Sequence, residues 1–289
     1  MADFEFNRLL IVESLTEKDF PSGLMLRDRL NGMSGDFPAG LSIEFTRVLG
    51  VADFLSLIDQ EVIRATGGDY PILHIEVHGS EDKKGLVFSD GSFLGWSSLA
   101  DALRKLNKAT SFNLLIAVAA CFGGYSLGMV APGAPAPCCA LIGPSDKIYG
   151  DELLGNFSAF YSEFLKNLHG ETAIAALKKN VLTTGRFETV SAPDWFFRIV
   201  KDYLLNHCTR DRLVERSRVI QRSYKANKAS ITQKVMLDII SKRNGKVVTE
   251  YYRTFFMLDD IPSNARRYLH PLLGALEKTN NFLEQQSKL

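Results

Sequence analysis

The first 150 residues alternate short apolar runs with segments of helical periodicity, and this alternation limits the possible folds more than any other feature. The apolar runs predict strands at 8–13, 41–48, 72–77, 114–120 and 139–142. Helical spacing of apolar residues between them predicts helices, chiefly at 22–30, 52–65 and 96–106. Strands that alternate with helices form βαβ units. We therefore expect an α/β domain with a mostly parallel sheet and helices on both faces.

The pattern changes near residue 187. Helical periodicity predominates at 194–206, 212–243 and 262–286, while the run of β-branched and aromatic residues at 246–258 predicts a strand. Residues 191–289 hold 18 Lys and Arg against 10 Asp and Glu, and the rest of the chain holds 16 against 23. Such an asymmetry suggests two parts with different partners. We expect an α/β domain over 1–186 and a basic, mostly helical region over 187–289.

Composition excludes several classes of protein. No apolar run approaches the roughly 18 residues that a membrane span needs. The N-terminal segment MADFEFNRLLIVES carries early acidic residues and no basic stretch before an apolar core, which is not typical of a secretory signal. The four cysteines include an adjacent pair and no C-x-x-C, so neither a disulfide framework nor a metal cluster is expected. We expect a cytoplasmic protein without a metal or other cofactor.

Two reactive side chains fall where predicted strands end. His78 and Gly79 follow the third strand, and Cys121 follows the fourth. In open parallel sheets, ligands bind at the carboxyl ends of the strands. If these two strands are neighbours, their ends lie about 5 Å apart. The amides of Gly79 and Cys121 would then be suited to hold an oxyanion.

His74, Glu76 and His78 alternate along the third strand and therefore share one face of the sheet. No third ligand for a zinc ion is evident near them. We expect His74 and Glu76 to form hydrogen bonds inside the fold.

A second nucleophile lies in the same stretch, since 124–128 spells G-x-S-x-G around Ser126. This pentapeptide is the nucleophile elbow of α/β-hydrolases when a helix follows the serine directly. Here the glycine- and proline-rich segment 128–137 follows, which predicts a flexible loop. A serine hydrolase using Ser126 therefore stays the weaker alternative, while Gly123 and Gly124 are expected to keep the turn beyond Cys121 open.

The two strand ends together resemble a known family. An apolar strand ending in His-Gly (ILHIEVHG), followed by one ending in small-Cys-x-Gly (LLIAVAACFGG), is similar to the caspase-like cysteine peptidases, clan CD. This group includes legumain, gingipain, separase and the bacterial CHAT-domain peptidases. The resemblance covers about residues 5–185, and the segment after Cys121 is closest to the CHAT type.

The resemblance implies a caspase-like three-layer sandwich and a His78–Cys121 dyad. Cys121 would form the acyl-enzyme. His78 would protonate the leaving amine, with no third carboxylate required. Gly79 and Cys121 would supply the oxyanion amides.

The resemblance also suggests where substrate specificity arises. Relatives that cleave after Arg or Lys carry an acidic residue in the first specificity pocket, often in the loop after the fifth strand. That loop, 143–152, offers Asp146 and then Asp151, and it contains no arginine to bind an acidic side chain. We expect protein or peptide substrates that are cleaved after a basic residue. The structural alternative is that Asp146 forms a turn and Asp151 caps the next helix.

The C-terminal region holds a dense set of arginines, among them Arg212, Arg216, Arg218 and Arg222. A solvated helix face is the simpler interpretation. The functional one is a surface for an anionic activator, such as a nucleotide second messenger or nucleic acid. Bacterial caspase-like peptidases often act as regulated effectors in defence or cell death, and a basic appended domain fits that role by analogy. A catalytically silent module that binds nucleotide or nucleic acid through this region is the other alternative.

Overall fold

The computed structural model describes residues 4–179, 186–226 and 232–288. The chain divides into two compact units. One comprises Met1–Ala131 with Ala136–Ser191, and the other comprises Pro132–Pro135 with Ala192–Leu289. The division falls after residue 191 rather than at the expected 186, because the last strand of the sheet occupies 187–191. No helix in the described part of the chain has both the length and the apolar character needed to cross a membrane.

The first unit is an α/β fold built on a mostly parallel mixed sheet. Within the described residues the sheet has eight strands, and its main path runs β2-β1-β3-β6-β7-β8. The strands are β1 (Arg8–Ser14), β2 (Ser42–Arg47), β3 (Pro71–Gly79), β4 (Gly85–Val87), β5 (Phe93–Gly95), β6 (Leu115–Ala119), β7 (Ala140–Pro144) and β8 (Phe187–Ser191). From β2 to β7 all neighbours on the main path are parallel, and β8 pairs antiparallel with β7. The short hairpin β4–β5 extends from the end of β3.

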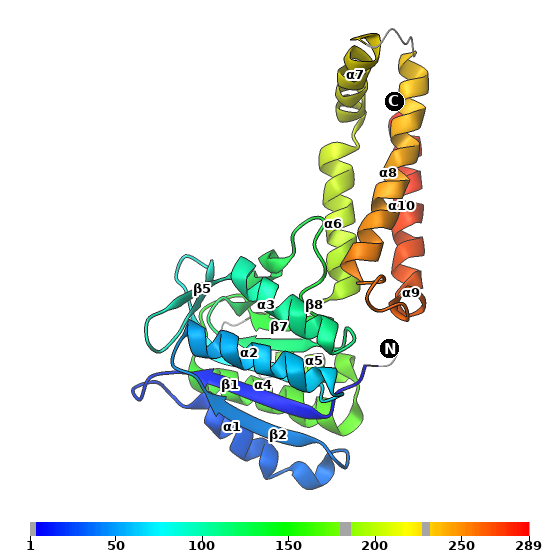
Figure 1. Ribbon diagram of the computed structural model, residues 1–289. Helices are drawn as coiled ribbons and strands as arrows, with labels where there is room; N and C mark the ends of the chain where they lie inside the picture. The colour runs from blue at the N-terminus through cyan, green and yellow to red at the C-terminus, as the bar shows by residue number, and fades with distance from the viewer. Residues whose placement is uncertain (1–3, 180–185, 227–231, 289) are drawn as a thin grey trace. The chain divides into compact units, whose positions relative to one another are not determined.

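Helices cover both faces of this sheet (Figure 1). The helical segments of this unit are α1 (Ser22–Asn31), η1 (Ser34–Asp36), α2 (Val51–Thr66), α3 (Trp96–Ala109), η2 (Gly123–Met129), α4 (Gly150–Asn167) and α5 (Gly170–Lys179). The buried apolar side chains of α1, α4 and α5 form one core with alternate residues of β1 and β6 and with Ile72 of β3. The expected α/β domain with a mostly parallel sheet is therefore confirmed.

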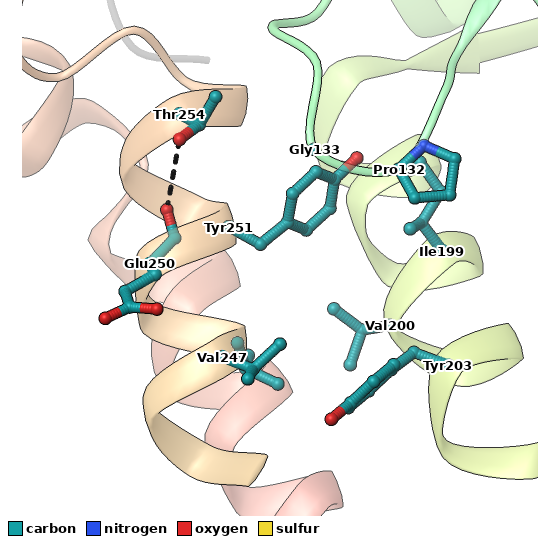
Figure 2. Close-up of a pocket in the computed structure, with 10 residues that line it drawn as sticks. Pro132, Gly133, Ile199, Val200, Tyr203, Val247, Glu250, Tyr251 and Thr254 are labelled. Carbon is teal, nitrogen blue, oxygen red and sulfur yellow. Dashed lines mark hydrogen bonds between the residues drawn. The ribbon is translucent and has the colours of Figure 1, made fainter. Parts of the chain in front are cut away.

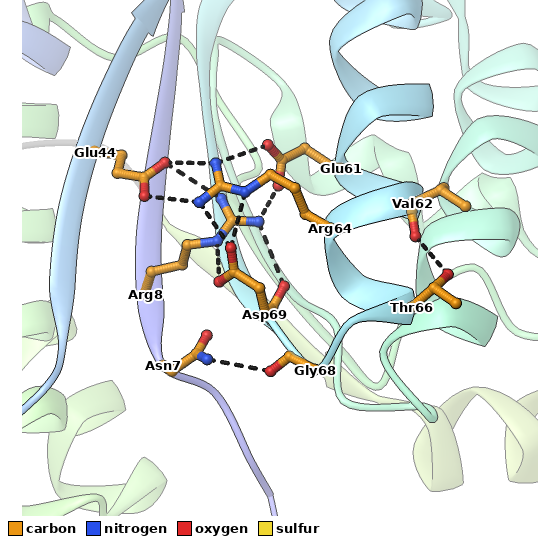
Figure 3. Close-up of polar contacts among 9 residues, drawn as sticks. All are labelled: Asn7, Arg8, Glu44, Glu61, Val62, Arg64, Thr66, Gly68 and Asp69. Atoms are coloured by element: carbon orange, nitrogen blue, oxygen red, sulfur yellow. Dashed lines mark hydrogen bonds and ion pairs between the residues drawn. The ribbon is translucent and has the colours of Figure 1, made fainter.

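An ionic network around the buried Arg8 ties the amino ends of the strands to α2, at the edge opposite the end of β3 (Figure 3). The Arg8 side chain is 1% exposed and pairs with Glu61, and its Nε donates to Asp69 Oδ1 at 2.6 Å. Arg64 lies beside it and donates to Glu44 Oε2 at 2.8 Å and to Asp69 Oδ2 at 2.8 Å. The hydrogen bond from Arg64 lowers the pKa of the Glu44 carboxyl. The charge of the buried Arg8 is thus compensated by three carboxylates: Glu61 on α2, Glu44 on β2 and Asp69 in the loop after α2.

The second unit is helical in the part that the structure describes. Its helices are α6 (Ala192–His207), α7 (Arg210–Ala226), α8 (Gln233–Phe255), α9 (Asn264–Arg267) and α10 (Leu269–Lys288). The helical C-terminal region is confirmed, but the predicted strand at 246–258 is wrong, because that segment continues α8 and ends it.

Packing of aromatic rings explains this helix. The ring centroid of Phe196 on α6 lies 5.4–5.9 Å from those of Tyr251, Tyr252, Phe255 and Phe256. Positions 252, 255 and 256 share one face of a helix but not of a strand. Burial of that face outweighs the preference of aromatic and β-branched residues for strands.

Candidate active site at the ends of β3 and β6

The strands β3 and β6 are neighbours and end at the same edge of the sheet. Their parallel register pairs Glu76 with Ala119. Two residues further along come His78 and Cys121, so the same register sets these two positions opposite each other. The approach is close, because a Cβ added to Gly79 would lie 1.7 Å from the backbone oxygen of Cys121. The structure therefore brings together the two strand ends that the sequence singled out.

The turn after β6 is strained and tightly packed. Phe122 has a positive φ of 61°, which is uncommon for a bulky residue and costs energy. Its amide donates to the backbone oxygen of Asp146 at 3.2 Å. Gly123 and Gly124 are both buried, and a Cβ on Gly123 would lie 2.4 Å from a backbone oxygen of β6. The expectation that these glycines keep the turn open is wrong. A larger residue would not fit at these positions, because the chain packs back onto the sheet.

The Cys121 side chain lies on the face of the sheet that α1 and α4 cover. It is half-buried against their apolar core and is a free cysteine. Its Sγ–H points to the backbone oxygen of Ile148, at 3.6 Å, which is a weak hydrogen bond. The thiol therefore sits between the sheet and the segment that leads into α4.

Ser126 is placed quite differently. Its side chain is fully buried, and its hydroxyl donates to the backbone oxygen of Gly123 at 2.5 Å. The surrounding pentapeptide lies within η2, so the expected flexible loop does not begin there. A nucleophile elbow exposes its serine at the top of the sheet. This geometry disfavours the serine alternative.

A carboxylate that the sequence did not single out lies next to His78. The His78 side chain is half-exposed, and its Nε2 lies 3.2 Å from Asp19 Oδ2. The same oxygen accepts from the amide of Thr16 at 2.8 Å and from its hydroxyl at 2.7 Å. Burial opposes ionisation of Asp19, but the hydrogen bonds from Thr16 and the proximity of His78 outweigh it and lower the pKa of that carboxyl. Asp19 lies in the loop between β1 and α1. The position of that loop at the carboxyl edge of the sheet is the only feature of the sequence that could have indicated a role for this residue.

Lys83 is the second residue that the sequence missed. It follows His78 in the loop between β3 and β4 and has a positive φ of 62°. Its Nζ lies 4.8 Å from the ring centroid of Phe122 and 4.7 Å from that of Tyr125, and it donates to the Tyr125 hydroxyl at 3.1 Å. Such cation–π contacts are attractive. Lys83 thus joins the loop after β3 to the turn after β6.

His74 and Glu76 form hydrogen bonds inside the fold, as predicted. His74 Nε2 lies 2.7 Å from Glu76 Oε2, and its Nδ1 lies 3.1 Å from the hydroxyl of Tyr161. The other oxygen of Glu76 accepts from the Ser22 hydroxyl. All four side chains are buried. They connect β3 to α1 and α4 beneath the candidate site.

The two acidic candidates for substrate recognition are both exposed, on the segment from β7 into α4. The backbone oxygen of Asp146 accepts from the Phe122 amide, and its carboxylate accepts from the neighbouring Ser145 hydroxyl at 3.5 Å. Asp151 lies in the first turn of α4, where a negative charge is favourable. Its carboxylate accepts from the Glu152 amide at 3.0 Å, so it satisfies one of the free amides at the start of the helix, as the structural alternative expected.

The four arginine candidates on α7 differ in their surroundings. Arg216 is half-buried, and its Nη1 approaches the backbone oxygen of His207 at 3.4 Å and Asn244 Oδ1 at 3.5 Å, which indicates a structural role. The other three are exposed: Arg212, Arg218 and Arg222. Arg212 also pairs with Glu215 at 3.0 Å on the same helix.

The helical unit contains a cavity of about 300 Å³ between α6 and α8 (Figure 2). Ile199 and Tyr203 line it from α6, and Val247 and Tyr251 line it from α8. Among the described residues its lining includes Glu250, whose carboxylate points away from the cavity in Figure 2, but no lysine or arginine. This cavity is therefore a poor site for an anion, unlike the exposed face of α7.

Comparison with known protein families gives no match for this chain, and comparison with curated proteins gives none.

Proposed function

We propose that this protein is a cysteine endopeptidase with a caspase-like three-layer α/β domain, in which Cys121 is the nucleophile and His78 the general acid. The observation that carries the proposal is the common register of β3 and β6, with Gly79 packed against the backbone of Cys121. Register brings a thiol and an imidazole to one sheet edge, where substrates bind in such folds. The burial of Ser126 supports the cysteine over the serine.

The proposed reaction is acyl transfer. Cys121 Sγ attacks the scissile carbonyl carbon, its proton passes to His78, and the carbonyl oxygen becomes an oxyanion held by the Gly79 and Cys121 amides. His78 then protonates the leaving amine as the C–N bond breaks. Water hydrolyses the thioester and regenerates the thiol.

The Gly79 amide is suitably directed for this role. Ser80 N donates to Gly85 O across the β3–β4 hairpin at 3.0 Å. Hydrogen-bonded and non-hydrogen-bonded pairs alternate along an antiparallel ladder. Gly79, which pairs with Leu86, is therefore in a non-hydrogen-bonded pair, and its N–H faces away from β4.

Substrate preference and regulation extend the proposal. The exposed carboxylates of Asp146 and Asp151 favour a basic residue before the scissile bond. The exposed arginines Arg218 and Arg222 on α7 favour an anionic activator, for which a nucleotide second messenger is the proposed class. The protein would then be a cytoplasmic effector of the kind that defence or cell-death systems keep inactive until signalled.

A peptide-cleavage assay with and without nucleotides tests the nucleophile. Cys121→Ala and His78→Gln are expected to abolish both cleavage and labelling by an acyloxymethyl ketone probe carrying a basic side chain. Cys139→Ala removes another half-buried thiol and is the matched control. Ser126→Ala should retain activity. Cleavage that persists in Cys121→Ala but is lost in Ser126→Ala would instead establish the serine hydrolase.

The catalytically silent alternative predicts a different pattern. Nucleotide or RNA would then bind the full chain, and the double substitution of Arg218→Ala with Arg222→Ala would weaken that binding. No condition would give cleavage or labelling that depends on Cys121. Arg253→Ala, which removes an exposed arginine from α8, is the control for charge alone.

A further inference from the structure

The loop between β1 and α1 carries Asp19 to His78, across the edge of the sheet from Cys121. Asp19 Oδ2 lies 3.2 Å from His78 Nε2. We propose that Asp19 is a positioning residue, which accepts a hydrogen bond from His78 Nε2 and leaves Nδ1 to exchange the proton with Cys121 and the leaving amine. This inference rests on the proposed function, and it departs from the dyad that the family resemblance implies.

Asp19 is held in place independently of His78. The Thr16 amide and hydroxyl both donate to Asp19 Oδ2, and the Asp19 amide donates back to Thr16 O at 3.0 Å. Two of these three hydrogen bonds hold the carboxylate itself, and the third closes a short, local turn in the backbone. A carboxylate held this way is a rigid acceptor, whereas a freely rotating one would lose orientation.

The nearby buried carboxylate does not compete for this role. Glu76 lies two residues before His78, but its oxygens accept from His74 and Ser22. Its hydrogen bonds are directed into the core between the sheet and α4. Within the described part of the chain, Asp19 is the carboxylate that pairs with His78.

The chemical consequence concerns the imidazole. A neutral histidine carries its proton on one of its two ring nitrogens. A hydrogen-bond acceptor beside one nitrogen holds the proton on that nitrogen. An acceptor at Nε2 fixes the proton there and keeps the Nδ1 lone pair available for the thiol proton. When His78 is charged, the Asp19 carboxylate stabilises the imidazolium without taking its proton.

The test uses the full-length chain with 15N-labelled histidine. At a pH where His78 is neutral, its 15N shifts report which nitrogen is protonated, and His78→Gln assigns the signals. We expect the Nε2–H tautomer in the wild type and in Glu17→Gln, which removes an exposed carboxylate from the same loop. In Asp19→Asn the tautomers should become mixed, and Asp19→Glu should partly restore the original ratio.

Kinetics then link the tautomer to the proposed reaction. Asp19→Asn is expected to lower kcat by about 100-fold, the lower end of what a positioned general acid contributes, while KM stays within about twofold. An unchanged tautomer in a folded Asp19→Asn variant overturns the inference. If the wild type has no peptidase activity but the tautomer still depends on Asp19, the proposed function fails and the positioning of His78 stands.

Discussion

Gly79→Ala tests the close approach of β3 and β6, on which the candidate site depends. The added Cβ would lie 1.7 Å from the backbone oxygen of Cys121 and 2.7 Å from its backbone carbon. Both atoms belong to the main chain, so no side-chain rotation relieves the clash. One strand end must move by more than about 1 Å to reach ordinary contact distance. Overpacking of this kind costs about 1–3 kcal/mol, and we expect about 3 kcal/mol because backbone meets backbone.

Native-state hydrogen exchange of the β3 and β6 amides measures this change in the unfolding free energy of the sheet. Gly155→Ala is the matched control, since it lies in α4 with nothing within 4 Å of the added Cβ. It should stabilise the same unit by up to about 1 kcal/mol through helix propensity. If Gly79→Ala changes the unfolding free energy by less than about 0.5 kcal/mol, the two strand ends are not in contact. The candidate site would then lose its geometric basis.

Three further predictions concern other contacts of the α/β unit. Arg8→Met removes the guanidinium that pairs with the buried carboxylate of Glu61. It should lower the unfolding free energy, measured in urea, by about 3–5 kcal/mol. Lys83→Met removes the cation from two aromatic rings and should speed hydrogen exchange in the turn after β6, for a loss of about 1–2 kcal/mol. The pKa values of Glu44 and Asp69 are lowered in the folded state, so their stabilising contribution is present above the unfolded values and is lost as pH falls through the folded ones. Urea unfolding at pH 7, 5 and 3 should therefore show falling stability below about pH 4, and equal stability at pH 7 and pH 3 would contradict the ionic network.

The strand ends could be predicted from the sequence because two simple rules apply to them. Apolar runs bounded by helical patterns located β3 and β6, and the rule for parallel sheets placed His78 and Cys121 at one edge. Neither rule gives the register, which pairs Glu76 with Ala119 and, continued by two residues, sets His78 and Cys121 opposite each other. Hydrophobic pattern fixes which strands form, while their lateral alignment depends on packing along the whole sheet.

The loop residues could not be predicted in the same way. Asp19 reaches His78 only because the local turn with Thr16 aims its carboxylate, and nothing in the apolar pattern encodes that turn. Ser126, the weaker alternative, is buried in the turn after β6, so the familiar pentapeptide around it does not form an exposed nucleophile elbow. The strand predicted at 246–258 is a helix because its aromatic face packs on Phe196 of α6, a contact that intrinsic preferences do not contain. Local turns decided the first two cases, and a contact between residues distant in sequence decided the third.

The turn after β6 depends on several such contacts at once. Phe122 keeps a left-handed backbone beside Cys121, and a strained residue persists only where its surroundings hold it. The Phe122 amide donates to the carbonyl of Asp146, and the Lys83 ammonium lies over the Phe122 ring. Gly123, the next residue, packs onto β6. These contacts come from the loops after β3, β6 and β7, so the backbone on which Cys121 sits is shaped by three neighbouring loops together. A substitution in any one of these loops is therefore expected to shift the backbone of Cys121 through its neighbour Phe122.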